Sequence, residues 1–270
     1  MERVRPNKSL RRTGAVSRKA QRLAIVLTAF VATASMRSQT SVKSNPPAPQ
    51  PDKPETFLQK VLRISGIAAS PSTLKGPGDD VVSGQVWLVD IASKKTRALS
   101  AAGGYSSPVF APRGDSIFVL HGGDVVRFNL SGGNPQKVCS IPGIQKLAGA
   151  SQDDADKLLI LGKDAAGNTA VGLLSVSTGK VEAVPFDPAS SEDRQMLGRL
   201  RGWDRVYGDK RVFVDRHSEQ SLAGPVQWTD VFLKEGTNLP VNESACDEVN
   251  CGQPSLSLDG KLLVFIRAEH

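Results

Sequence analysis

The sequence predicts an all-β protein, a β-propeller of about four blades, each a four-stranded antiparallel sheet. Two observations predict this fold. A strand–turn–strand pattern at residues 105–119 returns 146 residues later, at residues 252–265, and internal repetition favours stacked sheet units over one asymmetric core. A second pattern, a hairpin of two strands, alternates with the first along residues 85–267, as expected for propeller blades.

The hairpin pattern supplies the outer half of each expected blade. It consists of an apolar strand, a polar turn and a second strand, at residues 85–99, 124–138 and 171–184, with a looser copy at 226–237. Gly, Ser and Asn stand at the turns, where hairpins need residues that tolerate unusual backbone angles.

The strand–turn–strand pattern supplies the inner half. Besides the two good copies, degenerate copies occur at residues 147–161 and 197–215. The second strand of each copy is an unbroken apolar run, which suits a strand buried on both faces. Four outer hairpins and four inner pairs therefore alternate along the chain.

The two ends of the repeat region are each half a blade. The first outer hairpin, 85–99, and the last inner pair, 253–266, would each expose an apolar edge alone. We expect them to pair into one composite blade, which closes a ring of four. The alternative is an extra inner strand at 61–69, which would give an open or five-bladed array.

The repeat resembles that of the TolB-like (WD-like) β-propeller family. Residues 107–114 and 253–261 carry the resemblance, together with an outer strand at 87–91, whereas Arg113 and Gln152 depart from the family pattern. The resemblance implies a TolB-like propeller over residues 56–270 without the N-terminal α/β domain of TolB. It implies little about activity, because such blades occur in proteins of many functions.

The N-terminal residues 1–34 have the pattern of a signal peptide. A basic stretch is followed by an apolar stretch that ends in Ala32-Thr33-Ala34. Ala32 and Ala34 are the small residues of this cleavage site, and cleavage is expected after it. The alternative is an uncleaved membrane anchor, although the apolar run is shorter than the roughly 18 residues of a span. The sequence therefore predicts a periplasmic or secreted protein, or one anchored by this segment.

Charge limits the classes of partner. The formal charge of +7 comes from the signal peptide, since the rest of the chain has 26 basic and 26 acidic residues. A neutral mature chain lacks the clustered cations of a nucleic-acid binder. Residues 35–55 are Pro-rich and predicted to be a disordered linker. No membrane span is expected in the mature chain.

Three cysteines are present. Cys246 and Cys251 are separated by four residues and are expected to form a disulfide in an oxidising compartment, with Cys139 left as a thiol. No histidine lies near them to complete a zinc site.

No catalytic, cofactor-binding or metal-binding residue is predicted. Three histidines, His121, His217 and His270, follow inner pairs and could share one rim, but their offsets differ. The acidic groups Asp79-Asp80 and Asp153-Asp154 with Asp156 suit calcium only by composition, and the second group lies at a turn.

Other candidate residues have structural explanations. Gly114-Asp115-Ser116 lies at a turn, where Gly and Asp serve backbone geometry. Trp87, Trp203 and Trp228 could stack on a ligand but are expected to pack between strands. The residues expected to line the channel are mostly small: Ser107, Ala148, Arg199 and Ser255.

These observations predict an exported, non-catalytic scaffold without a cofactor. It would bind a protein, peptide or glycan in the cell envelope. The alternative is a propeller enzyme, a lyase or hydrolase, whose site is dispersed over several blades.

Overall fold

The computed structural model describes residues 55–67, 82–131, 133–222, 224–247 and 249–269. The predicted signal peptide, its cleavage residues Ala32 and Ala34, and the linker up to residue 54 lie outside this part. Among the described residues, no helix is long and apolar enough to cross a membrane.

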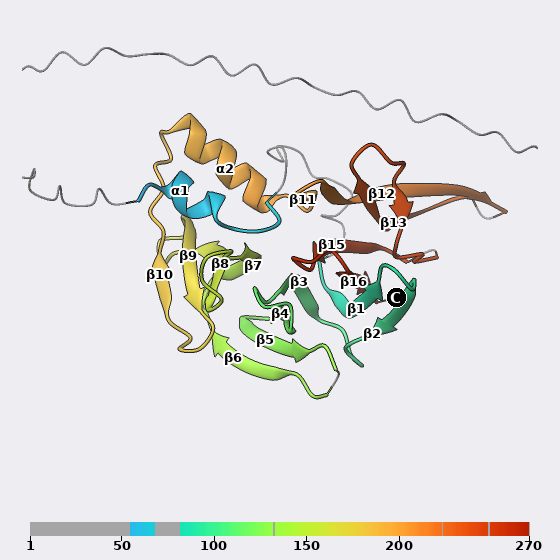
Figure 1. Cartoon of the computed structure of the whole chain (residues 1–270), viewed down its shortest axis with the longest axis horizontal. Helices are drawn as coiled ribbons and strands as arrows, with labels where there is room; N and C mark the ends of the chain where they lie inside the picture. Colours follow the sequence, from blue (N-terminus) through green and yellow to red (C-terminus); the bar gives the residue numbers. More distant parts are fainter. Residues whose placement is uncertain (1–54, 68–81, 132, 223, 248, 270) are drawn as a thin grey trace, which may run out of the picture. The chain divides into compact units, whose positions relative to one another are not determined.

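The described part is all-β, with two helices, and its strands form four antiparallel units of four strands each (Figure 1). The first unit is β15 (Cys251–Leu256), β16 (Leu262–Ala268), β1 (Gly84–Asp90) and β2 (Lys95–Ala98). The second is β3 (Tyr105–Phe110), β4 (Ser116–His121), β5 (Asp124–Asn129) and β6 (Gln136–Ser140). The third is β7 (Ile144–Ala150), β8 (Lys157–Lys163), β9 (Thr169–Ser175) and β10 (Val181–Ala183). The fourth is β11 (Arg205–Tyr207), β12 (Lys210–Ser221), β13 (Gly224–Glu235) and β14 (Val241–Asn242). One register pair, Gly84 with Tyr105, joins the first and second units into an eight-stranded sheet.

The first unit combines the two ends of the repeat region. β1 pairs with β16 along its whole length, from Gly84 opposite Ala268 to Asp90 opposite Leu262. Both strands are buried on both faces, which explains their unbroken apolar sequences. Val86 and Val264 belong to one hydrophobic core cluster, and Val89 and Phe265 belong to another. The expected pairing of the terminal halves is therefore present.

The alternative of an extra inner strand at 61–69 is wrong over its described residues. Phe57–Leu62 form helix α1, and beyond it one isolated bridge joins Ile64 to Ser151. Thr56 begins the helix with a capping box, its side chain accepting from Gln59 N while the Gln59 side chain accepts from Thr56 N.

The prediction of a degenerate inner strand pair at 197–215 is wrong for the first half of this range. Ser191–Arg201 form helix α2, and the inner strand of this unit, β11, begins only at Arg205. Ser190 caps the helix, and the buried Met196, Leu197 and Leu200 follow helical spacing. An amphipathic helix therefore forms where the repeat is weakest.

The two good repeat copies contain matching irregularities. Pro108 in β3 and Pro254 in β15 each lie within a register shift against the next strand. Proline cannot donate to a ladder and is tolerated at such bulges. The residues before them, Ser107 and Gln253, both have left-handed backbones, with φ of 53° and 54°. The sequence repeat is thus also a repeat of backbone geometry.

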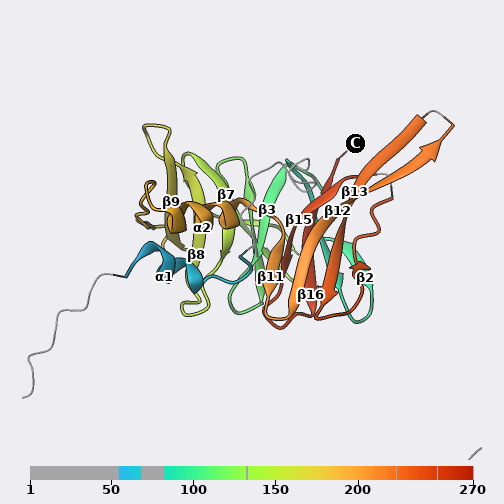
Figure 2. The ribbon, with the colours of Figure 1, turned by 90° about the horizontal axis from the view of Figure 1, so that it is seen from above.

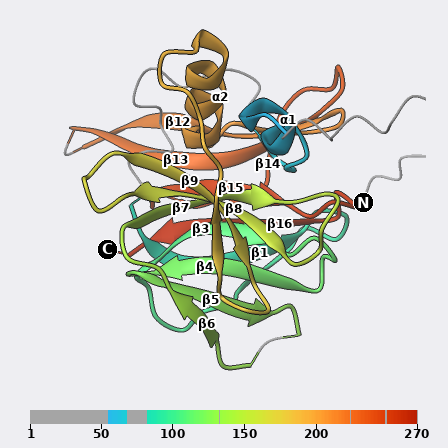
Figure 3. The same cartoon turned by 90° about the vertical axis from the view of Figure 1, so that its left-hand side faces the viewer.

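No described strand pairing joins the third unit to the fourth, unlike the first and second units. Here α1 and α2 lie beside each other (Figure 3). Residues 63–67, which we call the bridging segment, bond to both units: Ser65 N donates to Ala150 O on β7 at 3.0 Å, and Val206 N on β11 donates to Ile67 O at 3.2 Å.

The fourth unit also contains the longest hairpin. Strands β12 and β13 each have twelve residues and pair along their whole length, from Lys210 opposite Glu235 to Ser221 opposite Gly224. The far half of this hairpin extends beyond the neighbouring strands (Figure 2). Phe213 and Phe232 stack across this hairpin, and His217 stacks on Trp228.

Candidate binding cavity at the inner strands

Side-chain contacts link the inner strand β15 to two other inner strands, β3 and β11. Gln253 Oε1 on β15 accepts from Ser107 N on β3 at 2.6 Å. Tyr207 OH on β11 lies 3.2 Å from Ser255 Oγ on β15. Gly66 of the bridging segment has φ +72°, and a Cβ there would lie 2.3 Å from the Tyr207 hydroxyl oxygen. Only glycine fits this position.

Arg205 connects the third unit, the bridging segment and β11. Its side chain is 1% exposed, and its Nη1 donates to Ala148 O at 2.8 Å and to Gly66 O at 3.4 Å. Burial lowers the pKa of the guanidinium, while Tyr207 raises it. An arginine remains protonated in proteins, so these carbonyl groups solvate a buried cation.

A cavity of about 530 Å³ opens where β7, β11 and β15 turn into the strands that follow them. We call it the turn-end cavity. Its lining comes from α1, the bridging segment, α2, β11 and the three turns: Leu62, Ile64, Ser65, Gly66, Ile67, Gln152, Met196, Arg199, Val206, Tyr207, Gly208 and Leu258. Half of these are large apolar residues, and none is a carboxylate.

Two leucines of the turn-end cavity face solvent. Leu62 is 60% exposed and Leu258 is 49% exposed. On the cavity's polar side, Arg199 Nε is buried and has no hydrogen-bond partner among the described residues. A concave apolar surface with few polar groups is the usual form of a binding site. This cavity can therefore hold an apolar side chain, with the half-buried Arg199 in its lining.

Three of the four expected channel residues lie on inner strands, namely Ser107, Ala148 and Ser255. The fourth, Arg199, does not: it lies on α2 and reaches the turn-end cavity from there. Sequence reasoning missed Leu62 and Leu258. The signal for Leu258 was available, because it occupies the place in the second repeat copy that Pro112 occupies in the first.

The acidic and Ser-containing turns have structural roles in the described part. Asp156 accepts hydrogen bonds from Ser175 Oγ at 2.5 Å and Ser177 N at 2.7 Å. Ser116 Oγ donates to Asp115 Oδ1 at 2.9 Å within its turn. No group of three or more metal-ligating side chains occurs among the described residues. Asp79 and Asp80 lie outside them.

The histidines do not come together in the described part. His121 lies against the Tyr105 ring, with 4.8 Å between ring centroids, whereas His217 stacks on Trp228. His270 lies outside the described residues. The three tryptophans are partly buried and separate: Trp87 lies under Arg267, and Lys146 Nζ lies 3.3 Å from the Trp203 ring centroid.

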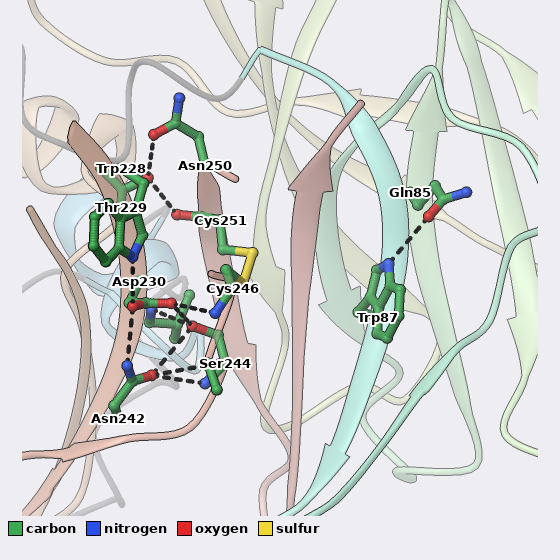
Figure 4. The surroundings of a disulfide bond; sticks show 12 residues. Gln85, Trp87, Trp228, Thr229, Asp230, Asn242, Ser244, Cys246, Asn250 and Cys251 are labelled. Carbon is green, nitrogen blue, oxygen red and sulfur yellow. Dashed lines mark hydrogen bonds between the residues drawn. A yellow bond between two sulfur atoms is a disulfide. The ribbon is translucent and has the colours of Figure 1, made fainter. Parts of the chain in front are cut away.

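Cys246 and Cys251 are joined by a disulfide (Figure 4). Cys139 is a free, half-buried thiol, and burial raises its pKa. Both ends of the disulfide loop also bond to β13: Cys246 N donates to Asp230 Oδ1 at 2.7 Å, and Thr229 Oγ1 donates to Cys251 O at 2.9 Å.

Asp230, Ser244 and His217 are close but do not form a nucleophile relay. His217 Nε2 lies 3.3 Å from Asp230 Oδ2 without hydrogen-bond geometry. Ser244 Oγ donates directly to Asp230 Oδ1 at 2.7 Å. In a serine hydrolase the imidazole stands between hydroxyl and carboxylate. Here the buried carboxylate instead holds the chain that leads to the disulfide.

No protein-family model and no curated protein sequence matches the chain. Similar solved structures include putative TolB from Agrobacterium tumefaciens, with 18% identity and a TM-score of 0.35 over 66% of this chain and 59% of that one. TolB from Acinetobacter baumannii has 15% identity and a TM-score of 0.32, over 70% and 47%. An acylaminoacyl peptidase in complex with Z-Gly-Gly-Phe-chloromethyl ketone has 14% identity and a TM-score of 0.32, over 71% and 34%. The chain thus spans less than two thirds of these proteins, and likenesses this low decide neither fold nor activity.

Proposed function

We propose that this protein is an exported, non-catalytic, four-bladed TolB-like β-propeller that binds a protein or peptide partner in the cell envelope through its turn-end cavity. The fold part of the proposal is supported by the order of contacts. The first unit packs on the second, the second on the third, and the fourth on the first. The bridging segment and Arg205 connect the third to the fourth, so each unit has two neighbours, as blades of a closed ring have.

The single observation that supports binding is the composition of the turn-end cavity. It combines exposed leucines with a half-buried arginine, Arg199, and its described lining residues include no carboxylate. Burying Leu62 and Leu258 against a partner would remove apolar surface from water, at about 25 cal/mol per Å². Arg199 would give orientation by bonding a backbone carbonyl or a carboxylate of the partner.

The experiment compares two pairs of exposed leucines after chemical crosslinking in the native envelope. Leu62→Ser with Leu258→Ser changes the cavity. Leu222→Ser with Leu239→Ser is the matched control, because these leucines are 112% and 86% exposed and do not line the cavity. We expect one crosslinked protein partner with the unchanged protein and the control, and its loss from the cavity variant. A partner retained by the cavity variant, or no protein partner at all, contradicts the proposal.

Export has its own test. N-terminal sequencing of the mature protein should give a first residue near Ser35, after the Ala32-Thr33-Ala34 site. Recovery of the intact Met1 terminus in the membrane fraction would show an anchor instead.

A further inference from the structure

A second and larger concave site lies on the other side of α2. This groove, which we call the α2 groove, has a volume of about 890 Å³. It is lined by α2, the β8–β9 turn and the chain before the helix: Asn168, Thr169, Phe186, Pro188, Ser191, Arg194, Gln195, Leu197, Gly198 and Arg201. It shares no lining residue with the turn-end cavity.

The described residues that line the α2 groove carry two positive charges and include no carboxylate. Arg194 and Arg201 are both exposed. Arg194 Nη1 donates to Pro188 O at 3.3 Å, and Arg201 Nη2 donates to Thr169 Oγ1 at 3.0 Å. Neither guanidinium pairs with a carboxylate among the described residues. Since each has five N–H donors, most of this capacity is available to a ligand.

The same groove has an apolar wall and a low floor. Phe186 and Leu197 provide apolar surface, and Phe186 is held by the Phe57 ring, with 5.7 Å between centroids. Gly198 follows Arg194 by four residues, so both lie on one face of the helix. With no side chain there, the floor stays open between the two arginines.

The spacing of the arginines limits the ligand. Seven residues of helix place Arg194 and Arg201 about 10 Å apart along the axis. In an extended peptide, side chains at positions i, i+2 and i+4 lie on one face. Two carboxylates four positions apart have Cα atoms about 13 Å apart, and their flexible side chains can approach both guanidinium groups. An apolar side chain between them would face Phe186.

We propose that the α2 groove binds an acidic, extended peptide segment of a partner protein, with one carboxylate at Arg194, a second at Arg201 and an apolar side chain against Phe186. This site is additional to the turn-end cavity and does not depend on it. Paired guanidinium–carboxylate contacts give geometric specificity as well as affinity.

The probe is a fluorescein-labelled eight-residue peptide with two glutamates four positions apart, a leucine midway between them, and Gly and Ser elsewhere. Its twin has glutamines in place of the glutamates. By fluorescence anisotropy in 20 mM salt, we expect the glutamate peptide to bind the mature protein about tenfold more tightly than the twin. The variant Arg194→Gln with Arg201→Gln should lose this difference. The control variant Lys95→Gln with Lys261→Gln removes the same charge from the first unit and should keep it.

Two further arms make the outcome decisive. The unfolding temperature of the arginine variant should equal that of the control, since both side chains are exposed. The variant Leu62→Ser with Leu258→Ser should still bind the probe, so this proposal and the proposed function fail separately. Equal binding of both peptides, full affinity in the arginine variant, or equally tight binding of an oligothymidylate with two phosphates would each overturn the proposal.

Discussion

The sheet units are connected at two places by different means, and the difference follows the quality of the repeat. In the first unit, the two ends of the repeat region join by seven register pairs between β1 and β16. Between the third and fourth units, α1, the bridging segment and Arg205 fill the space. Good repeat copies therefore join by strand pairing, whereas degenerate copies are joined by an inserted segment that must solvate a buried cation.

Deleting residues 253–270 should have the largest effect. It removes β16 and most of β15, and so exposes the apolar faces of β1, including Val86 and Val89. We expect cooperative unfolding to disappear in calorimetry, because half a sheet unit is not stable alone. Deleting residues 1–34 is the control and should leave the transition intact. A sharp transition only a few degrees lower would show that the last pair is an appendage.

Arg205→Met tests the second junction. The variant leaves the carbonyl groups of Ala148 and Gly66 without their charged donor, and hydrogen bonds to charged groups are worth about 1.5–3 kcal/mol each. We expect the free energy of unfolding in urea to fall by about 2–4 kcal/mol.

The matched control is Arg211→Met, whose guanidinium is exposed and paired with Asp204. Exposed ion pairs contribute about 0–1 kcal/mol. Equal stabilities of the two variants would mean that Arg205 does not hold the junction.

The disulfide tests a third contact, between the end of the fourth unit and the start of β15. Cys246→Ala with Cys251→Ala should lower the free energy of unfolding by about 1–3 kcal/mol, because a loop this short restricts the unfolded chain little. Hydrogen bonds from Cys246 N and Thr229 Oγ1 should keep the loop in place. Cys139→Ala is the control. If non-reducing peptide mapping finds three free thiols in the native protein, the disulfide does not form and this contact is absent.

The two junctions also show what sequence can and cannot predict. The pairing of β1 with β16 was predictable, because runs such as 262–266 are apolar at every position and each terminal half lacked a partner. Helix α2 was missed although Met196, Leu197 and Leu200 have helical spacing, since a strand was expected there from the repeat. Arg205 was not predictable: its burial depends on carbonyl groups of Gly66 and Ala148, which meet only in three dimensions.

The candidate sites were less predictable than the fold. The turn-end cavity draws on α1, α2 and three turns, so no contiguous motif marks it. Arg199 was named for the wrong element, and the leucines resembled ordinary turn and helix residues. The disulfide pair was the one site that a short spacing could indicate.

A smaller effect is expected from acid, and it concerns the turns in all units except the fourth. Five turn aspartates have lowered pKa values: Asp90, Asp124, Asp156, Asp164 and Asp259. Hydrogen bonds from Ser93 lower the pKa of Asp90, and one from Ser257 lowers that of Asp259. For Asp156, burial alone would raise the pKa, but hydrogen bonds from Ser175 and Ser177 outweigh it.

The sign follows from linkage. A carboxyl whose folded pKa lies below its ordinary value of 3.8 stabilises the fold above that pH, and this contribution is lost as the pH falls through the folded pKa. We expect the free energy of unfolding to be level between pH 7 and about 5 and to decline below about pH 4. Asp259→Asn should make the decline shallower. Stability that rises between pH 5 and pH 3 is incompatible with this assignment.

Residue-resolved native-state hydrogen exchange tests the comparison most directly. Amides of β1 and β16, such as Leu88 and Val264, should exchange together and only by global unfolding, because these strands pair along their whole length. Amides at the second junction, Ser65 and Val206, should exchange faster by local opening, and faster still in Arg205→Met while β1 and β16 stay unchanged. If β1 exchanges faster than β16, or faster than the bridging segment, the ends of the repeat region are not joined as described.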